Sequence, residues 1–326
     1  MAQKTNLNVA PYFDDFTSSD NFHQVLFRPG FSVQARELTQ LQSLLKNQME
    51  TSGRHLFKEG AMVVPGQVGY QQLTFIKLEN TFNGESIDVT QYLDETTPII
   101  ITGATSGVKA KVIKVAAATT SDPATLFVST TAAGTDAVST TFTNGENLSA
   151  NVGVTHTTSY SIDNASATLK ADSATGTSGA ANIQNGVYFV RGQYVEVLEE
   201  TLIVSKYAGD FTGRIGLKLT ESIITPEGDI TLTDNAAGSS NFAAKGAHRL
   251  KISCALAQVS ISSTADSDFI ELLRVKDGQL QQQVRATEFG TIENTFARRT
   301  HDESGDYTVR PFMYEAKESV TLYENI

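Results

Sequence analysis

The stretch Gly186-Val-Tyr-Phe-Val-Arg-Gly192-Gln-Tyr-Val-Glu-Val197 predicts a β-hairpin that turns at Arg191-Gly192, because apolar residues alternate on both sides of a glycine. Similar short apolar runs recur along the chain and are separated by Gly, Asn and Asp; they lie at 61–64, 73–78, 108–115, 126–130, 201–207, 214–219, 230–232, 248–257 and 269–275. This pattern predicts a mainly β protein made of several small antiparallel β-sandwich or barrel domains.

The composition limits the classes of partner. The 326 residues are enough for roughly two domains, and 36 acidic against 25 basic residues give a net charge of −11. Such a surface repels nucleic acid and anionic lipid, so we expect neither as a partner. A single cysteine, Cys254, excludes an intrachain disulfide. No apolar run reaches the roughly 20 residues of a membrane helix, and the N-terminus does not resemble a signal peptide, so we expect synthesis in a cytoplasm.

Residues 1–31 predict an extended N-terminal arm. Pro11 and Pro29 disfavour a helix, and the aromatic residues between and around them have no helical period. An isolated arm cannot bury its own rings, so they need either the rest of the fold or a neighbouring subunit. These rings are Tyr12, Phe13, Phe16, Phe22 and Phe27.

An amphipathic helix is predicted over residues 32–53, with Ser32 as its N-cap and Gly53 as its stop signal. Its apolar stripe consists of Leu38, Leu41 and Leu45, and is widened by Leu44 and Met49. Two interpretations remain open. The helix packs on a sheet of its own chain, or it meets symmetry mates in a short dimeric or trimeric bundle.

The remaining chain divides into three predicted parts. Residues 54–79 and 186–326 form the main β domain or domains, and 80–157 form a small inserted β module in which Asn83-Gly84 and Asn144-Gly145 mark tight hairpin turns. Residues 158–185, rich in Ser, Thr, Ala and Gly, predict a linker. The segment 281–295 fits either a short helix or a polar strand.

No motif in the sequence predicts catalysis, a cofactor or a metal. The five histidines lack helical ligand spacing, and the Gly-Ala-Thr-Ser-Gly run at 103–107 lacks the lysine of a phosphate loop. Asp302, Glu303 and Asp306 could serve as the acid and base of a glycosidase, but a salt-bridged turn ending at Gly305 explains them more simply. A second group of oxygen-bearing side chains consists of Asp229, Asp234 and Asn235. Turn capping explains these residues better than calcium binding does.

Three strings carry a resemblance to a known family. They are Phe27-Arg-Pro-Gly-Phe-Ser-Val-Gln-Ala-Arg-Glu-Leu-Thr-Gln-Leu-Gln42, the blocks between Gly186 and Arg249, and Arg298-Arg-Thr-His-Asp-Glu-Ser-Gly-Asp-Tyr-Thr-Val-Arg-Pro-Phe312. Together they resemble virion structural proteins of tailed bacteriophages that share a domain without assigned function. The 80–157 insert resembles small β modules of marine myovirus tail proteins.

The resemblance implies a structural subunit of a virion, in the tail baseplate or at a fibre-attachment point, and no enzymatic activity. Relatives continue beyond the Val-Arg-Pro-Phe string whereas this chain stops at Ile326, which favours an adaptor over a receptor-binding tip. Two alternatives remain, namely a tail fibre or adhesin that binds host surface glycans, and a polysaccharide depolymerase. We expect other tail or baseplate proteins as partners, together with a homodimer or homotrimer. The predicted partner interface consists of Tyr12, Phe13, Phe16, Phe22, Phe27, Leu38, Leu41 and Leu45.

Overall fold

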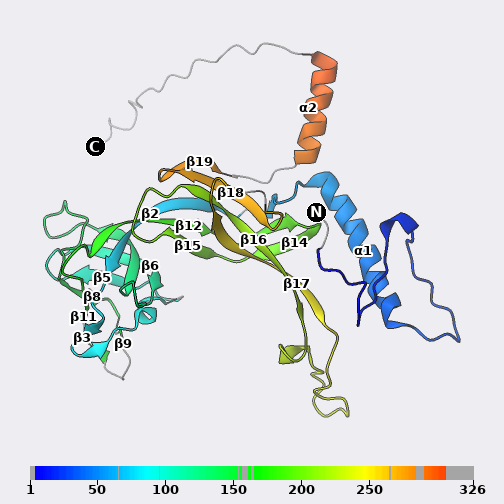
Figure 1. Cartoon of the computed structure of the whole chain (residues 1–326), viewed down its shortest axis with the longest axis horizontal. Helices are drawn as coiled ribbons and strands as arrows, with labels where there is room; N and C mark the ends of the chain where they lie inside the picture. Colours follow the sequence, from blue (N-terminus) through cyan, green and yellow to red (C-terminus); the bar gives the residue numbers. More distant parts are fainter. Residues whose placement is uncertain are drawn as a thin grey trace, which may run out of the picture.

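We describe a computed structural model of the chain. It describes residues 4–64, 66–94, 96–152, 154–155, 161–162, 165–263, 266–283 and 290–305. The fold is mainly β and antiparallel, with an extended N-terminal arm and an N-terminal helix, which confirms the predicted fold class. Figure 1 shows a β module at one end, a central β body, and two helices at the opposite side of the body.

The largest sheet has eight strands and joins the module to the body. In spatial order its strands are β11 (Ala165–Thr168), β8 (Asn147–Ala150), β5 (Ile100–Gly103), β6 (Lys109–Ala116), β7 (Thr125–Ala132), β2 (Val68–Lys77), β12 (Thr175–Ile183) and β15 (Glu200–Ser205).

The body adds a four-stranded sheet and a three-stranded sheet, and two small hairpins complete the strands. The four-stranded sheet consists of β17 (Arg249–Val259), β16 (Gly213–Ile224), β18 (Phe269–Lys276) and β19 (Gln279–Gln283). The three-stranded sheet consists of β1 (Met62–Val64), β13 (Gly186–Val190) and β14 (Gln193–Val197), and the small hairpins are β3 (Thr81–Phe82) with β4 (Glu85–Ser86) and β9 (Val154–Thr155) with β10 (Ser161–Ile162).

The two α-helices are α1 (Ala35–Leu56) and α2 (Gly290–Ser304), and short 3-10 turns occur at η1 (Ser18–Asp20), η2 (Val89–Tyr92) and η3 (Ile230–Leu232). Among the described residues, no helix is long and apolar enough to cross a lipid bilayer. The long β16–β17 hairpin projects away from the body (Figure 1).

The segment 158–185 is not a plain linker, because it contains β11 and the central strand β12. β12 pairs with β2 at nine consecutive positions, from Thr175 opposite Ile76 to Ile183 opposite Val68. Its small residues permit close packing: a Cβ added at Gly176 would lie 2.7 Å from the ring of Phe75. The glycine and alanine content that suggested a linker therefore serves a tightly packed strand. Residues 156–160 and 163–164 lie outside the described ranges.

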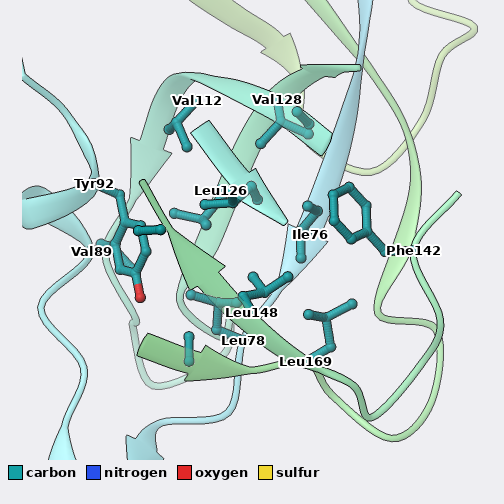
Figure 2. Packing of buried hydrophobic residues seen from close by; sticks show 14 of the residues in the cluster. Ile76, Leu78, Val89, Tyr92, Val112, Leu126, Val128, Phe142, Leu148 and Leu169 are labelled. Carbon is teal, nitrogen blue, oxygen red and sulfur yellow. The ribbon is translucent and has the colours of Figure 1, made fainter. Parts of the chain in front are cut away.

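The inserted module is not independent of the main domain, because β2 and β12 belong to its sheet as well as to the body. Its core draws residues from both sides of the predicted boundaries at 80 and 157 (Figure 2). Buried members of this core are Ile76, Leu78, Val89, Tyr92, Val112, Leu126, Val128, Phe142, Leu148 and Leu169. A second core lies in the body and includes Met62, Tyr188, Val190, Ile215, Leu217, Leu273 and Val275.

The two Asn-Gly pairs have different roles. Asn83-Gly84 forms the predicted hairpin turn between β3 and β4, with positive φ angles of 51° and 85°. Gly145 also has a positive φ, of 75°, but the strands on its two sides, β7 and β8, are not neighbours in the sheet. The prediction of a second hairpin is therefore wrong, since an Asn-Gly pair fixes a local turn and not the strands that flank it.

The end of the described chain is helical where the sequence suggested a turn. The segment 281–295 holds the end of β19 and the start of α2, and Arg298–Glu303 lies within α2. The helix ends at Ser304 and is followed by Gly305, whose φ is 64° and whose amide donates to the carbonyl of His301. The strand predicted at 307–312 lies outside the described residues.

Candidate interaction surface

The start of the arm is fixed to a buried ion cluster in the body. Arg191 sits at the tip of the β13–β14 hairpin with 3% of its side chain exposed, and it pairs with both Glu221 and Asp268. The amides of Lys4 and Thr5 donate to the Glu221 carboxylate at 3.1 and 2.7 Å, and the Lys4 ammonium contacts Asp268 at 2.5 Å. Residues at the start of the arm therefore complete the cluster.

A second set of contacts fixes the arm to α1 and to the projecting hairpin. Asp14 accepts a hydrogen bond from Ser43 at 2.5 Å, and Asp15 pairs with Arg36 at 2.9 Å. The Tyr12 hydroxyl lies 2.6 Å from Nδ1 of His248. These contacts hold the arm at its polar residues and leave most of its rings free.

The arm carries exposed apolar side chains. Phe13, Phe22 and Phe27 are between 49% and 66% exposed, whereas Tyr12 and Phe16 are half-buried. Sequence reasoning did not single out five further exposed side chains of this region, although their residue types alone could have indicated them. These are Val9, Leu26, Phe31, Val33 and Leu56.

Helix α1 begins three residues later than predicted because Gln34 and Glu37 form a capping box, in which the Gln34 amide donates to the Glu37 carboxylate at 3.0 Å. Leu44 is buried, and Leu41 is half-buried. Leu44 lines a cavity of about 560 Å³ between the arm and α1, together with Phe16 and Phe22. Leu38, Leu45 and Met49 are more than half exposed. The helix therefore packs on the arm with one face and presents a second apolar face to solvent.

Gly53 does not end the helix, which continues to Leu56. It is buried, and a Cβ built on it would lie 2.5 Å from the ring of Phe189. Phe189 in turn packs with Phe57 and Tyr194, at ring-centroid distances of 5.9 and 5.5 Å. Gly53 is thus a point of close approach between α1 and the β13–β14 hairpin, and this contact orients the exposed face.

We expect Gly53→Ala to destabilise the chain by up to about 2 kcal/mol. Overpacking against Phe189 costs about 1–3 kcal/mol and outweighs the roughly 1 kcal/mol that alanine gains over glycine in a helix. Ser52→Ala, at the exposed neighbouring position, is the control and should be neutral or slightly stabilising. Urea unfolding measures both, and a gain in stability for Gly53→Ala would show that the contact with Phe189 is not tight.

The pKa of Glu221 is lowered to about 2 in the folded chain. Burial alone would raise this pKa, but hydrogen bonds from the Thr5 hydroxyl, from the amides of Lys4 and Thr5, and from Arg191 outweigh it. Because the folded pKa is depressed, this carboxylate contributes its full stabilisation above its ordinary pKa of 4.5. The contribution is lost as the pH falls from there towards 2.

We therefore expect the unfolding free energy to fall more steeply with decreasing pH, between about 4.5 and 2, in the unaltered chain than in Glu221→Gln. The difference between the two curves isolates Glu221 from the other acidic groups. Urea unfolding at a series of pH values measures it. Parallel curves would mean that Glu221 is not held as a carboxylate by the arm.

The acidic groups with a conceivable catalytic or metal role lie apart from this surface. Asp302 and Glu303 are exposed on α2, and Asp306 lies outside the described residues. In the projecting hairpin, Asp229 and Asp234 accept hydrogen bonds from the amides of Thr231 and Ala236, as expected of turn caps. No group of three or more potential metal ligands occurs within the described ranges.

Backbone amides of the glycine-containing loop at 103–107 donate hydrogen bonds to a carboxylate of the same chain. Thr105 and Ser106 each donate an amide hydrogen bond of 2.8 Å to the carboxylate of Glu146, which is 4% exposed. The Ser106 hydroxyl and the Thr143 amide donate to the same carboxylate. A side chain of the same chain thus occupies the position that an anion would take in a phosphate loop.

Comparison with known proteins identifies one family. A family model described as a domain of unknown function (DUF4815) matches residues 10–150 and 165–322, which is most of the chain. No curated protein and no solved structure matches the chain. The matched residues include most of the arm, the whole of α1 and the strands of the body. The chain therefore belongs to the DUF4815 family, whose function is unknown.

Proposed function

We propose that this chain is a structural subunit of a tailed-phage virion, in the tail baseplate or as a tail-fibre attachment protein, and that it works by binding other protein chains. The supporting observation is the concentration of exposed apolar residues at the N-terminus. Among the described residues, 11 of the 23 exposed large apolar side chains fall within residues 9–56. Large exposed apolar patches mark interaction sites in soluble proteins.

The way in which the arm is held favours a preformed interface. Its polar contacts at Lys4, Thr5, Asp14 and Asp15 order the backbone before any partner binds. Ordering the binding segment in advance reduces the entropy cost of association. The arm therefore presents its rings in a fixed arrangement, as a subunit in a rigid assembly requires.

The placement in a phage tail rests on the resemblance of the strings quoted above. The first of them, Phe27–Gln42, encodes the junction between arm and α1, where Phe27, Phe31, Val33 and Leu38 are all about half exposed or more. The string with the virion resemblance is thus the one that carries much of the exposed surface. The proposed role involves no catalysis.

Immunogold electron microscopy tests the location. Antibodies raised against the purified chain should label the tail end of particles of the virus that encodes it, and pre-adsorption with the purified chain should remove the label. Labelling of the capsid, or purified particles that contain none of the chain by mass spectrometry, would contradict the proposal.

A further inference from the structure

Four exposed residues form a straight apolar ridge along α1, which we call the α1 ridge: Leu38, Leu45, Met49 and Leu56. Leu56, at one end of the ridge, also lines the cavity between α1 and the arm. Their spacings are seven, four and seven residues. At about 100° per residue, these spacings place all four side chains within about 40° of one another around the helix axis. The ridge is about 27 Å long at 1.5 Å per residue. Each of its side chains is between 38% and 57% exposed.

The sequence spacing of the four α1 ridge residues is symmetric, because seven, four and seven residues separate them in either chain direction. Its centre lies level with residue 47, so Leu38 and Leu56 are equidistant from it, as are Leu45 and Met49. A two-fold axis at this level brings two α1 helices together in antiparallel orientation. Leu38 of one copy then faces Leu56 of the other, and Leu45 faces Met49. The contact is self-complementary, as a two-fold interface must be.

The charges of α1 favour a second copy over a charged partner. The charged side chains of α1 all lie at least about 80° around the helix axis from the centre of the ridge; they are Arg36, Glu37, Lys46, Glu50 and Arg54. The residues that flank it within about 40° are the uncharged Gln42 and Ser52. With a net charge of −11 per chain, two copies repel each other in general, and an uncharged face is where they approach at least cost.

We propose that two copies of this chain pair through antiparallel packing of their α1 ridges. The inference rests on the proposed assembly function and specifies its partner. A helix of 22 residues is about 33 Å long and about 10 Å wide. It therefore covers about 330 Å², less than the roughly 800 Å² per partner of a stable interface. The arm adds further exposed apolar area to this contact, because Phe27, Phe31 and Val33 directly precede the helix and are exposed.

Cysteine cross-linking tests the orientation, with Leu38→Cys and Leu56→Cys prepared separately in a Cys254→Ala background of the full chain. In the antiparallel pair, residue 38 of each copy faces residue 56 of the other, while like residues lie about 27 Å apart. Mild oxidation of a 1:1 mixture should give disulfide-linked dimers that contain one chain of each variant. Each variant alone should remain unlinked, and circular dichroism should show that both are folded.

Three results would overturn the proposal. Cross-linking of each variant with itself would show parallel helices, as in a cyclic trimer, and would leave the proposed assembly function standing. If the folded variants oligomerise but no sample forms cross-links, the interface lies elsewhere on the chain. This result would also be compatible with the proposed assembly function. Absence of cross-links in a chain that stays monomeric would count against both the α1 pairing and the assembly function.

Discussion

Arg191→Met is expected to lower the free energy of unfolding by about 3–5 kcal/mol, because removal of one partner from a buried ion pair leaves the other charge uncompensated. Arg191 and Glu221 are 3% and 5% exposed, and Asp268 is 28% exposed. Without the guanidinium, two carboxylates face each other with only the contacts from Lys4 and Thr5. The backbone at Arg191 has a φ of 51°. Methionine keeps an unbranched Cβ there, so the change removes the charge with little added backbone strain.

Lys245→Met is the matched control. Lys245 pairs with Glu227 at 2.7 Å, but the two side chains are 69% and 56% exposed. Exposed ion pairs contribute about 0–1 kcal/mol. Urea unfolding of both variants should therefore separate them by several kcal/mol. Equal losses would mean that the Arg191 cluster is as well solvated as the surface pair.

Replacement of both central residues of the α1 ridge, Leu45→Glu with Met49→Glu, is expected to raise the dissociation constant of the oligomer by at least about 100-fold. An apolar side chain of this size gains about 1.5–3 kcal/mol on burial, and a two-fold contact contains each residue twice. Leu45 and Met49 are 57% and 56% exposed in the single chain, so only about half of this gain is lost. The loss is then at least about 3 kcal/mol, and each 1.4 kcal/mol is a factor of ten. The four new carboxylates also repel one another across the contact.

The control carries the same change of charge on other exposed apolar residues, as Val138→Glu with Leu198→Glu. These side chains are 79% and 69% exposed and belong to the module and to the body. Light scattering after size-exclusion chromatography should show the control as an oligomer and the ridge variant as a single chain. A ridge variant that keeps the mass of the unaltered chain would exclude the ridge from the interface.

The hairpins and alternating strands could be predicted because their signals are local. The alternation on both sides of Arg191-Gly192 and the Asn83-Gly84 pair each fix a turn within a few residues. Strand β12 could not be predicted in the same way, because its Ser, Gly and Ala residues have low strand propensity by themselves. They suit the strand only because Phe75 of β2 needs the space at Gly176. That requirement is a tertiary one.

The candidate surface was predictable in its aromatic and leucine residues but not in its anchors. Residue type alone indicates that Phe13, Phe22 and Phe27 need a partner. The contacts of Lys4 and Thr5 with Glu221 join residues more than 200 positions apart in the sequence. A local sequence pattern cannot predict a contact between residues so far apart. Gly53 was misread for a similar reason, since a glycine at a close approach to Phe189 looks like a helix stop in the sequence.

Sedimentation equilibrium of the unaltered full chain, from micromolar concentrations to the limit of solubility, tests most directly whether the N-terminal apolar surface is an interface between copies. We predict a mass of at least two chains over most of this range, with dissociation only at the lowest concentrations. The mass of one chain at every concentration would contradict the account.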